Sequence, residues 1–411
     1  MQGVIKMSDS VHLSATSTSS VKFDSPDAVH QASVSSDPIT AYDQLRQQCP
    51  IKHDSHLNWA VFKHADVLKA LLDHQTFSNV VSRHVSVPNG MDQPEHTVYR
   101  ALIDPYFSEQ RMAAFAPVCQ QVASDLVKQA PKNQEFDVIE EFARVYAVQV
   151  QCAFLGWPES MYEPLNQWVR KNHRATLAQD RAAMADIALE FDGFIRDLLD
   201  DRRQLGDQAP DDLTTALMRE RVNQQVIPDE VIVSILRNWT VGELGTIAAC
   251  VGIIVKYLAE HQDLQQQLRQ QPEQLVAAMD EILRIHPPLI ANRRVTTQAV
   301  EVGGQALAAG ERLTLLWASA NRDECVFGNP DEFKMVRDPE LNLLFGAGIH
   351  VCPGAGLSRL VLRLVMEELL HATSRITLAS NAQPVHAKYP AGGYDTLIVK
   401  LVVDTHCESS G

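Results

Sequence analysis

The feature that most limits the fold is a long apolar segment in the second half of the chain, roughly from Val231 to Ala259. A helix that is apolar over most of its surface must be buried, either in lipid or in a protein core. A lipid-spanning helix would rarely carry charged residues. This segment is interrupted by Arg237, Asn238, Glu243 and Lys256. It therefore predicts a helix in the core of a soluble protein.

Composition excludes several classes of protein. The net charge of -15 argues against a nucleic-acid partner, which requires a basic face, and against docking on anionic lipid. The seven cysteines are odd in number, scattered, and form no C-x-x-C pair, which favours a reduced protein over a disulfide framework or a zinc site. Residues 1–20 contain no apolar core of a signal peptide. We predict a cytoplasmic protein with no membrane association.

The chain divides into three parts by composition. Residues 1–35 are rich in Ser, Thr, Val and Asp without periodicity, and predict a disordered N-terminal tail. Residues 36–404 carry helical patterns with a few strand patterns and no internal repeat, and predict one large domain that is mainly α with small β-sheets. Residues 405–411 predict a polar C-terminal tail or a truncated linker.

Periodicity and breaker residues place the individual elements. Helices are expected at 38–48, 63–72, 97–129 with a break after residue 107, 136–155, 160–176, 180–203, 211–221, 228–260, 272–286 and 353–372. Short strands are expected at 56–62, 295–297, 300–302, 312–316, 376–378 and 397–403.

The strongest chemical signal is the segment Phe345-Gly-Ala-Gly-Ile-His-Val-Cys352-Pro-Gly354. Cys352 directly precedes an amphipathic helix, where unpaired backbone N–H groups stabilise the thiolate form that binds metals. The glycines leave room for a bulky, flat group to approach the backbone. A buried structural cysteine is the ordinary alternative for such a residue taken alone.

This segment resembles the haem-binding signature of the cytochrome P450 family, F-x-x-G-x-x-x-C-x-G, at every fixed position: Phe345, Gly348, Cys352 and Gly354. The resemblance extends over roughly residues 36–404 and implies the P450 fold. It also implies haem b as the cofactor, with the Cys352 sulfur as the ligand of the iron. A thiolate ligand donates electron density that favours O–O cleavage.

Two further patterns agree with this family. Glu281-Ile-Leu-Arg284 is an E-x-x-R pair at helical spacing, which alone would be an ordinary ion pair. In the family, such a pair forms a structural network with a later arginine, here Arg337, that fixes the cysteine loop. His96 and Arg100 share one helix face and could bind carboxylates, although a solvated face is the commoner explanation. By position, His96, Arg100, Arg294 and His350 match family contacts to the haem propionates.

The oxygen-activating helix departs from the family pattern. In Trp239-Thr-Val-Gly-Glu-Leu-Gly-Thr246 the family threonine is present as Thr246, but Gly245 stands where an acid is usual. Glu243 lies three residues before Thr246, on nearly the same face. Our hypothesis is that Thr246 orders water beside dioxygen and that Glu243 delivers protons. The alternative is that Glu243 is solvent-facing or ion-paired.

The resemblance implies a monooxygenase that inserts one oxygen atom from O₂ into a small hydrophobic organic substrate by hydroxylation, dealkylation or epoxidation. The chain carries no G-x-G-x-x-G fingerprint after a strand and no iron–sulfur cysteine cluster. Electrons from NAD(P)H must therefore arrive through a ferredoxin and its reductase, or through a fused flavin and iron–sulfur reductase. The Thr246 segment is similar to that of self-sufficient bacterial members with such a fusion.

Two other functions remain open at this point. The missing acid at Gly245 favours a peroxygenase driven by hydrogen peroxide, and a haem-based sensor without turnover is the third possibility. Apolar residues that could line a substrate pocket or belong to the core are Val80, Val81, Val85, Val87, Leu165 and Leu177.

Overall fold

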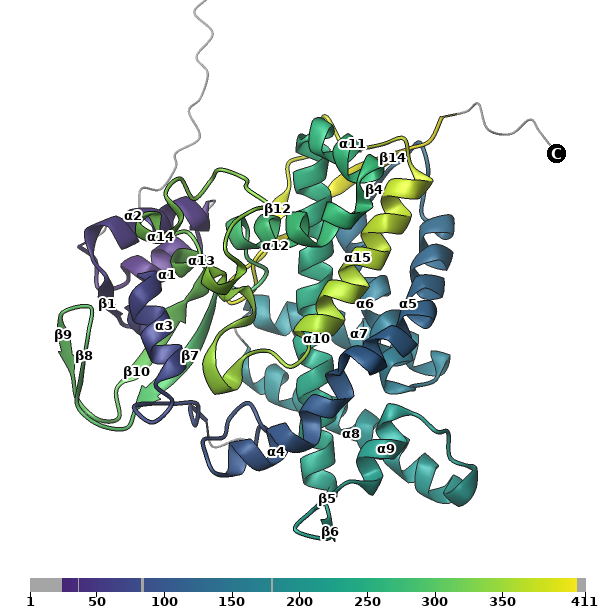
Figure 1. Ribbon diagram of the computed structural model, residues 1–411, viewed down its shortest axis with the longest axis horizontal. Coiled ribbons are helices and arrows are strands. Elements are labelled where there is room, and N and C mark those ends of the chain that lie inside the picture. The colour runs from purple at the N-terminus through teal and green to yellow at the C-terminus, as the bar shows by residue number, and fades with distance from the viewer. Residues whose placement is uncertain (1–23, 36, 83–84, 179, 405–411) are drawn as a thin grey trace, which may run out of the picture.

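A computed structural model describes residues 24–35, 37–82, 85–178 and 180–404. The predicted C-terminal tail and residues 1–23 of the predicted N-terminal tail lie outside these described residues. Within the described part, long helices occupy one side of the molecule and the largest sheet occupies the other (Figure 1).

The helical side is built around helix α10 (Asp229–Glu260), which runs through its centre (Figure 1). Its apolar residues are buried on nearly all sides, as the sequence predicts for a core helix. Helices that pack against it are α6 (Arg144–Leu155), α8 (Arg181–Leu205), α12 (Leu275–Ile285) and α15 (Ala355–Ala372). Helix α15 also packs along α5 (Glu109–Gln129).

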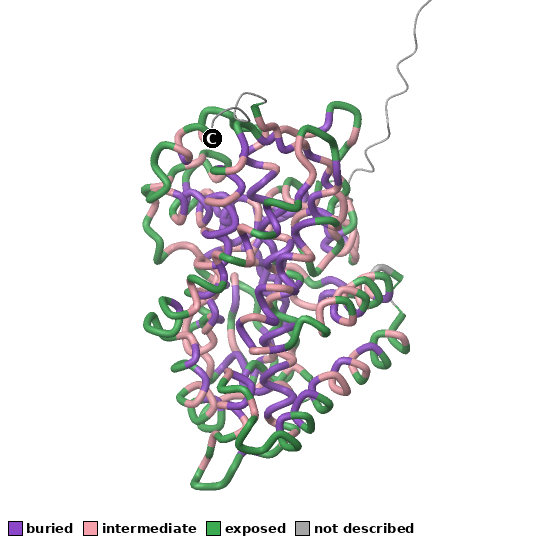
Figure 2. The backbone as a smooth tube through the Cα atoms, turned by 90° about the vertical axis from the view of Figure 1, so that its right-hand side faces the viewer, coloured by how far each residue is buried: buried purple, intermediate pink, exposed green. Residues whose placement is uncertain are grey.

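Further helices complete this side and the connections. They are α3 (His64–Leu72), α4 (Glu95–Ile103), α7 (Tyr162–Ala178), α9 (Leu213–Arg219), α11 (Gln262–Gln270), α13 (Trp317–Ala320) and α14 (Glu324–Phe327). Figure 2 shows that buried segments run through the middle of the molecule, while exposed segments follow its outer loops.

The largest sheet has five strands in the order β1-β2-β10-β7-β3. Strand β2 pairs with β1 in antiparallel and with β10 in parallel orientation, and β7 pairs with β10 and β3 in antiparallel orientation. The bounds are β1 (Ile51–Asp54), β2 (Asn58–Val61), β3 (Phe77–Ser78), β7 (Ala291–Thr296) and β10 (Arg312–Leu316). One face packs against α3 and the other against α1 (Ala28–Ser33) and α2 (Pro38–Gln48).

Smaller sheets fill the remaining edges of the described structure. A three-stranded sheet joins β4 (Glu135–Asp137), β14 (Ile398–Val402) and β11 (Arg375–Leu378). Three two-stranded sheets contain β5 (Arg221–Val222) with β6 (Gln225–Val226), β8 (Val300–Val302) with β9 (Gln305–Leu307), and β12 (Val385–His386) with β13 (Tyr394–Thr396).

The structure corrects three sequence predictions. The N-terminal tail does not extend to residue 35, because helix α1 packs its alanine and valine side chains under the sheet and the Asp54 carboxylate accepts two of its backbone N–H groups. The helix predicted to start at residue 136 begins later, because 135–137 pair with β14. Polar α11 was not predicted, because its one buried stripe is formed largely by Gln265 and Leu268.

Helix α10 is long and apolar enough to cross a membrane if judged by length and composition alone. In the structure, however, 61% of its most apolar stretch is buried inside the protein. Its surroundings are therefore those of a core helix.

Candidate active site

Cys352 lies in a loop that joins the three-residue helical turn Leu343–Phe345 to helix α15. Its backbone N–H donates to the Phe345 carbonyl at 2.9 Å, which closes the loop. The helix begins at Ala355 with Gly354 as its N-cap, so the sulfur lies just ahead of the helix end. The Gly354 N–H donates a hydrogen bond to the Cys352 sulfur.

Two opposing influences act on the Cys352 thiol. Burial and the nearby Glu243 carboxylate raise its pKa to about 11, whereas the Gly354 N–H and the cations Arg100 and Arg359 work against this rise. The free thiol therefore keeps its proton at neutral pH. Coordination to a metal removes such a proton outright, and the N–H donor and the two cations then stabilise the thiolate.

The glycines of this loop serve packing within the protein. Gly346 and Gly348 both have positive φ angles, at 75° and 71°, which favour glycine. A side chain at Gly348 would collide with the Leu71 carbonyl at the end of α3, and one at Gly346 would press on the Trp317 ring. At Gly348 the missing side chain therefore serves packing against α3, whereas Gly346 lines the cavity and its predicted role in making room for a flat cofactor stays a prediction.

Glu281 and Arg284 form the buried network that the E-x-x-R pattern predicted. The Arg284 guanidinium donates two hydrogen bonds to the Glu281 carboxylate, at 2.7 and 2.9 Å, and Arg337 donates a third at 2.8 Å. The remaining Arg284 donors bind the backbone carbonyls of Asn321 and Pro330. This confirms the three predicted members and shows how they tie helix α12 to the irregular segment before the cysteine loop.

The network continues to the cysteine loop through two asparagines. The Asn321 amide oxygen accepts the Leu343 N–H at 2.8 Å, and its amide nitrogen donates to Asn342 at 3.1 Å. Asn342 in turn donates to the carbonyl of Asp280 at 3.2 Å. Because Leu343 opens the turn that contains Phe345, these bonds fix where the loop begins.

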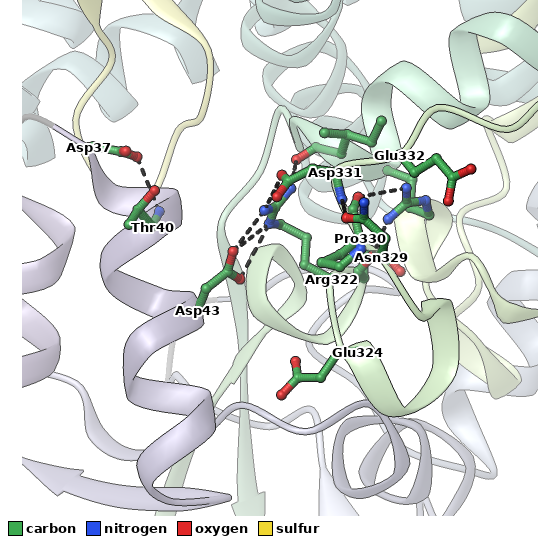
Figure 3. Close-up of polar contacts among 12 residues, drawn as sticks. Asp37, Thr40, Asp43, Arg322, Glu324, Asn329, Pro330, Asp331 and Glu332 are labelled. Carbon is green, nitrogen blue, oxygen red and sulfur yellow. Dashed lines mark hydrogen bonds and ion pairs between the residues drawn. The ribbon is translucent and has the colours of Figure 1, made fainter.

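A second ion-pair group ties the same segment to helix α2. Figure 3 shows Arg322 between two carboxylates, with Asp43 of α2 on one side and Asp331 on the other. The Arg322 guanidinium lies 2.7 Å from Asp43 and 2.6 Å from Asp331. The sequence analysis did not include Asp43, because no local pattern links two residues so far apart in the chain.

Phe345 is covered on one side by a cation. The Arg359 guanidinium lies 4.6 Å from the centre of its ring, and the Asp280 carboxylate holds that guanidinium at 2.9 Å. Asp280 neighbours Glu281 on helix α12. One turn of this helix therefore supports both the buried Glu281 network and the arginine that covers the Phe345 ring. The sequence analysis missed Asp280 and Arg359, since they meet only when α12 and α15 pack.

Cys352, Phe345 and His350 open onto a cavity of about 600 Å³ between the large sheet and helix α10. Thr246, Gly242 and Cys250 of α10 form one part of its wall. Apart from the neighbouring residues and backbone of α10 itself, no atom of the described residues lies within 4 Å of the position that a side chain at Gly242 or Gly245 would occupy. These two glycines therefore keep space open, while Gly252 permits close contact with Ile139. Further lining residues include Asn79, Val81, Ser86, Asn89, Leu289, Asn292, Arg293 and Arg294.

Arg294 and His350 line this cavity near the cysteine loop, and His96 lies behind them against the His350 ring. The rings of His96 and His350 lie 4.1 Å apart, and the Nε2 atoms of both are buried without a hydrogen-bond partner in the described structure. Burial lowers the pKa of His350 to about 3, with His96, Arg294 and Arg100 adding to the effect. Burial also lowers the pKa of Arg294 to about 10.

This gathering of donors fits the carboxylates of a haem. Unpaired buried donors are costly, and an anionic group that accepts from them would remove that cost. Two imidazole rings and one buried guanidinium suit the two propionates of haem b, and the sulfur of Cys352 opens onto the same cavity. The donor set and the cavity are thus those that the cofactor requires.

Arg100 holds the backbone of the cysteine loop. Its guanidinium donates to the backbone carbonyls of Ile349 and Val351, at 3.0 and 2.8 Å, and forms an ion pair with Asp104 at 2.7 Å. In this arrangement Arg100 supports the loop that carries His350 and Cys352. These bonds involve Nε and Nη1 of Arg100, and the predicted contact with a propionate stays a prediction.

Thr246 and Glu243 are on the predicted helix face, but their side chains do not meet. The Thr246 hydroxyl donates to the Gly242 carbonyl of its own helix. The Glu243 carboxylate accepts from the Ser358 hydroxyl at 3.4 Å, across the gap to helix α15. Burial raises the pKa of Glu243 to about 7. Glu243 has no ion-pair partner among the described residues, and the sequence offered no signal for its contact with Ser358.

The apolar residues expected to line the pocket are mostly elsewhere. Val81 lines the cavity, whereas Val87 and Leu165 belong to the core, and Val80 and Val85 are exposed. The side chain of Leu177 lies outside the described part of the structure. The cavity is nevertheless largely apolar, as expected, because other residues such as Leu283, Leu289 and Leu362 line it, beside the amides of Asn79, Asn89 and Asn292.

A mainly helical fold that presents a cysteine sulfur and orphaned histidines to one internal cavity defines a haem-thiolate protein. The cytochrome P450 family model matches residues 157–377, which is more than half of the chain. The chain therefore belongs to the cytochrome P450 family. As such it is a monooxygenase, an oxidoreductase whose cofactor is haem b.

Individual relatives agree with the family match over most of their length. Cytochrome P450 109 of Bacillus spizizenii is 29% identical, with 85% of this chain and 88% of the relative aligned. Linalool 8-monooxygenase of Pseudomonas putida is 28% identical over 89% and 96% of the two chains. The structure of open cytochrome P450 EryK from S. erythraea has a TM-score of 0.82 and 26% identity, and covers 90% and 97%.

Proposed function

We propose that this P450 inserts one oxygen atom from O₂ into a small organic molecule, by hydroxylation, dealkylation or epoxidation, with electrons that come from NAD(P)H through redox proteins. The observation that carries the proposal is the shared cavity of Cys352, Thr246 and His350. Similar proteins include an erythromycin C-12 hydroxylase and a cyclomarin C epoxidase, each 28–29% identical.

The proposed cofactor contacts follow from the donors in the cavity. The Cys352 sulfur would hold the iron, with Phe345 and Gly354 beside it, while His96, Arg294 and His350 would bind the propionates. Arg100 would hold the loop backbone and is also proposed to bind a propionate, while Gly348 would act through the loop backbone. When bound, haem supplies the iron at which dioxygen is reduced. Everything else in the reaction depends on how the chain positions substrate, water and protons.

Thr246 is proposed to order water above the cofactor. Its hydroxyl proton is engaged by the Gly242 carbonyl, so the hydroxyl oxygen is available to accept a hydrogen bond from a water in the cavity. The space around Gly242 and Gly245 leaves room for that water. An ordered water at this point can pass a proton toward the oxygen that is being reduced.

Glu243 is proposed to resupply that water with protons. In the structure its carboxyl group rests on Ser358, so the relay requires the side chain to rotate from helix α15 toward Thr246 on its own helix. The two residues are three positions apart, which is a separation that one side-chain rotation can bridge. The Ser358 contact would then be the resting position of the proton donor.

The electron donor is proposed to be a separate ferredoxin with its reductase, or a fused flavin and iron–sulfur reductase. The sequence contains neither a dinucleotide fingerprint after a strand nor a cysteine cluster for iron–sulfur. The six cysteines that the structure describes are all free thiols, which supports the proposal of a reducing, cytoplasmic location.

A peroxygenase is the second candidate function, and one observation favours it. Gly245 stands where the family usually carries an acid, and the space beside it is open. Hydrogen peroxide already contains the two electrons that the redox partner would supply and the two protons that the relay would supply, so a weak relay matters less with peroxide. A sensor without turnover has no comparable observation in its favour.

Turnover of an aromatic ether distinguishes these functions. The purified haem-loaded protein is supplied with hydrogen peroxide alone, or with NAD(P)H and a surrogate ferredoxin and reductase. Turnover only with the electron-transfer system supports the monooxygenase reaction. Comparable, sustained turnover with peroxide alone supports the peroxygenase, and no turnover with either supports the sensor. In the first case, Gly245→Asp should lower peroxide leakage, because it restores an acid at a position with room for it.

A further inference from the structure

Arg293 and Arg294 are neighbours on strand β7 but project from opposite faces of the sheet. Arg294 pairs with Leu313, whose side chain packs on the α3 side of the sheet. Arg293 pairs with Thr314, which in turn pairs with Ala60 on the face that covers α1 and α2. Both arginines line the cavity, so Arg293 reaches it from the face opposite to the proposed propionate site.

The Arg293 guanidinium has no carboxylate partner in the described structure. Its side chain is hydrogen-bonded to the Tyr389 hydroxyl, in the segment between strands β12 and β13. Among the described residues, no Asp or Glu forms an ion pair with Arg293, whereas Arg46 and Arg322, in the segments beside the sheet, each pair with a carboxylate. Arg293 is exposed, as expected at the mouth of a cavity.

The charge of the cavity wall contrasts with that of the whole protein. The net charge of the chain is -15, yet the described residues that line the cavity include two arginines and neither Asp nor Glu. A wall of one sign raises the local concentration of ligands with the opposite charge. Arg294 is assigned to the cofactor, which leaves the positive charge of Arg293 without a counterpart.

We propose that the substrate is an organic acid whose carboxylate is bound by Arg293 at the cavity mouth, with Tyr389 holding the guanidinium in place. This inference rests on the proposed monooxygenase function and adds the chemical class of its substrate. Arginine binds carboxylates with two parallel hydrogen bonds, and Tyr389 limits the directions in which its planar group can face. The rest of the substrate would extend past Val81 and Leu289 toward Thr246.

A haem propionate is the other carboxylate that Arg293 could bind. The strand geometry argues against it, because His96, His350 and Arg294 gather on the α3 side of β7 whereas Arg293 projects from the other. The two sources differ in a measurable way. If Arg293 served the cofactor, its loss would weaken haem binding, whereas a substrate anchor can be removed without haem loss.

The test compares matched pairs of acids and neutral alcohols on the haem-loaded full chain. Decanoate is paired with decan-1-ol, and 4-phenylbutyrate with 4-phenylbutan-1-ol. Binding is followed by the haem spin-state shift and by calorimetry. The parent protein should bind at least one acid about tenfold more tightly than its alcohol, which is the size expected for a charge-assisted hydrogen-bonded pair. Raising the ionic strength should reduce this preference.

Variants test whether the preference for acids over alcohols comes from Arg293. Arg293→Gln should abolish the preference for the acid and change the affinity for the alcohol by less than about twofold, whereas Arg293→Lys should retain part of it. Tyr389→Phe should weaken acid binding less than Arg293→Gln does. Arg375→Gln is the control, because it removes the same charge from β11, a strand that does not line the cavity.

The binding results decide whether Arg293 anchors an acid substrate. It is overturned if no acid binds better than its alcohol in the parent, if Arg293→Gln weakens both partners equally, or if Arg293→Gln loses haem. The parent comparison needs no variant and holds even if Arg293→Gln fails to fold. A missing red-shifted ferrous carbon monoxide band in the parent would instead remove the proposed function itself, and this inference with it. An intact band without acid preference removes only the inference.

Discussion

The imidazole rings of His96 on helix α4 and His350 in the Cys352 loop lie 4.1 Å apart, and both Nε2 atoms are buried without a partner in the described structure. We expect His96→Leu and His350→Leu to release haem about tenfold faster, because each removes a donor to a propionate. Haem transfer to a scavenger protein measures the rate. His371→Leu on the exposed end of α15 is the control, and unchanged transfer rates in both variants would contradict the assignment.

Cys352 and Cys250 both line the cavity, but only Cys352 lies in a loop with an N–H donor and cations beside it. We expect Cys352→Ala to lose the red-shifted ferrous carbon monoxide band, since that band reports thiolate ligation. Cys250→Ala should keep it, because burial in helix α10 raises the pKa of that thiol strongly. A band that survives in Cys352→Ala and disappears in Cys250→Ala would reverse the assignment.

Removing one partner of the Glu281–Arg284 pair leaves an uncompensated buried charge. We expect Arg284→Met to lower the free energy of unfolding by about 3 kcal/mol. The control is Arg363→Met, which breaks a more exposed pair with Glu367 one turn away on α15 and should cost less than about 1 kcal/mol. Urea unfolding of both variants measures the difference. Equal losses would show that burial of the pair contributes nothing.

Thr246 and Thr240 both donate to a backbone carbonyl of helix α10, but only Thr246 lines the cavity. We expect Thr246→Ala to divert electrons to hydrogen peroxide and to slow substrate oxidation by about tenfold or more, because ordered water is lost. Thr240→Ala should not change the amount of peroxide formed per NADPH consumed.

Glu243→Gln should resemble Thr246→Ala if Glu243 resupplies protons. Peroxide per NADPH consumed is the measurement, and unchanged coupling in Glu243→Gln would remove the relay role.

His286 makes stability depend on pH. Burial, with Arg322 and Lys256 nearby, lowers its pKa to about 4, whereas in an unfolded chain it is close to the ordinary 6.5. Above the unfolded value both states are neutral and nothing is lost. As the pH falls from about 6.5 to about 4, the unfolded chain binds a proton that the folded protein rejects, so stability decreases by roughly 2 kcal/mol.

The variant His286→Asn checks this expectation. Its urea midpoint should decrease less than that of the parent between about pH 7.5 and about pH 5, because the titrating group is gone. His371→Asn, on the exposed end of α15, should follow the parent curve. Parallel curves for the parent and His286→Asn would show that this imidazole does not contribute to acid sensitivity.

Much of the fold was predictable from local patterns. The bounds of α2 and β10 agree with the predicted 38–48 and 312–316, and α10 begins and ends within one residue of the expected range. Their periodicity and breaker residues act within a few positions of each other. Helix α11 and strand β4 were missed, because the first is polar apart from one stripe and the second exists only through pairing with β14.

The candidate active site was likewise predictable in part, where its features depend on residues close together in the sequence. The motif around Cys352, the E-x-x-R pair and the haem b cofactor could be derived from residue types at fixed spacings, because the chemistry of a thiolate and of a buried ion pair depends on neighbours close in sequence. The direction of each side chain could not. Arg100 binds the loop backbone, Glu243 rests on Ser358, and Arg359 covers Phe345 because separate helices pack together.

The sequence by itself thus determined the family, the haem-thiolate chemistry and the order of the main helices, since these follow from short-range spacing. Only the tertiary structure decided that Arg294 lies on the α3 side of the sheet and Arg293 on the side of α1 and α2, because pairing with β10 and β2 sets the neighbours on each face. It also decided that a largely apolar cavity wall carries two arginines and, among its described residues, neither Asp nor Glu, although the chain is acidic. Both are results of long-range packing, which brings together residues that carry no signal of one another along the chain.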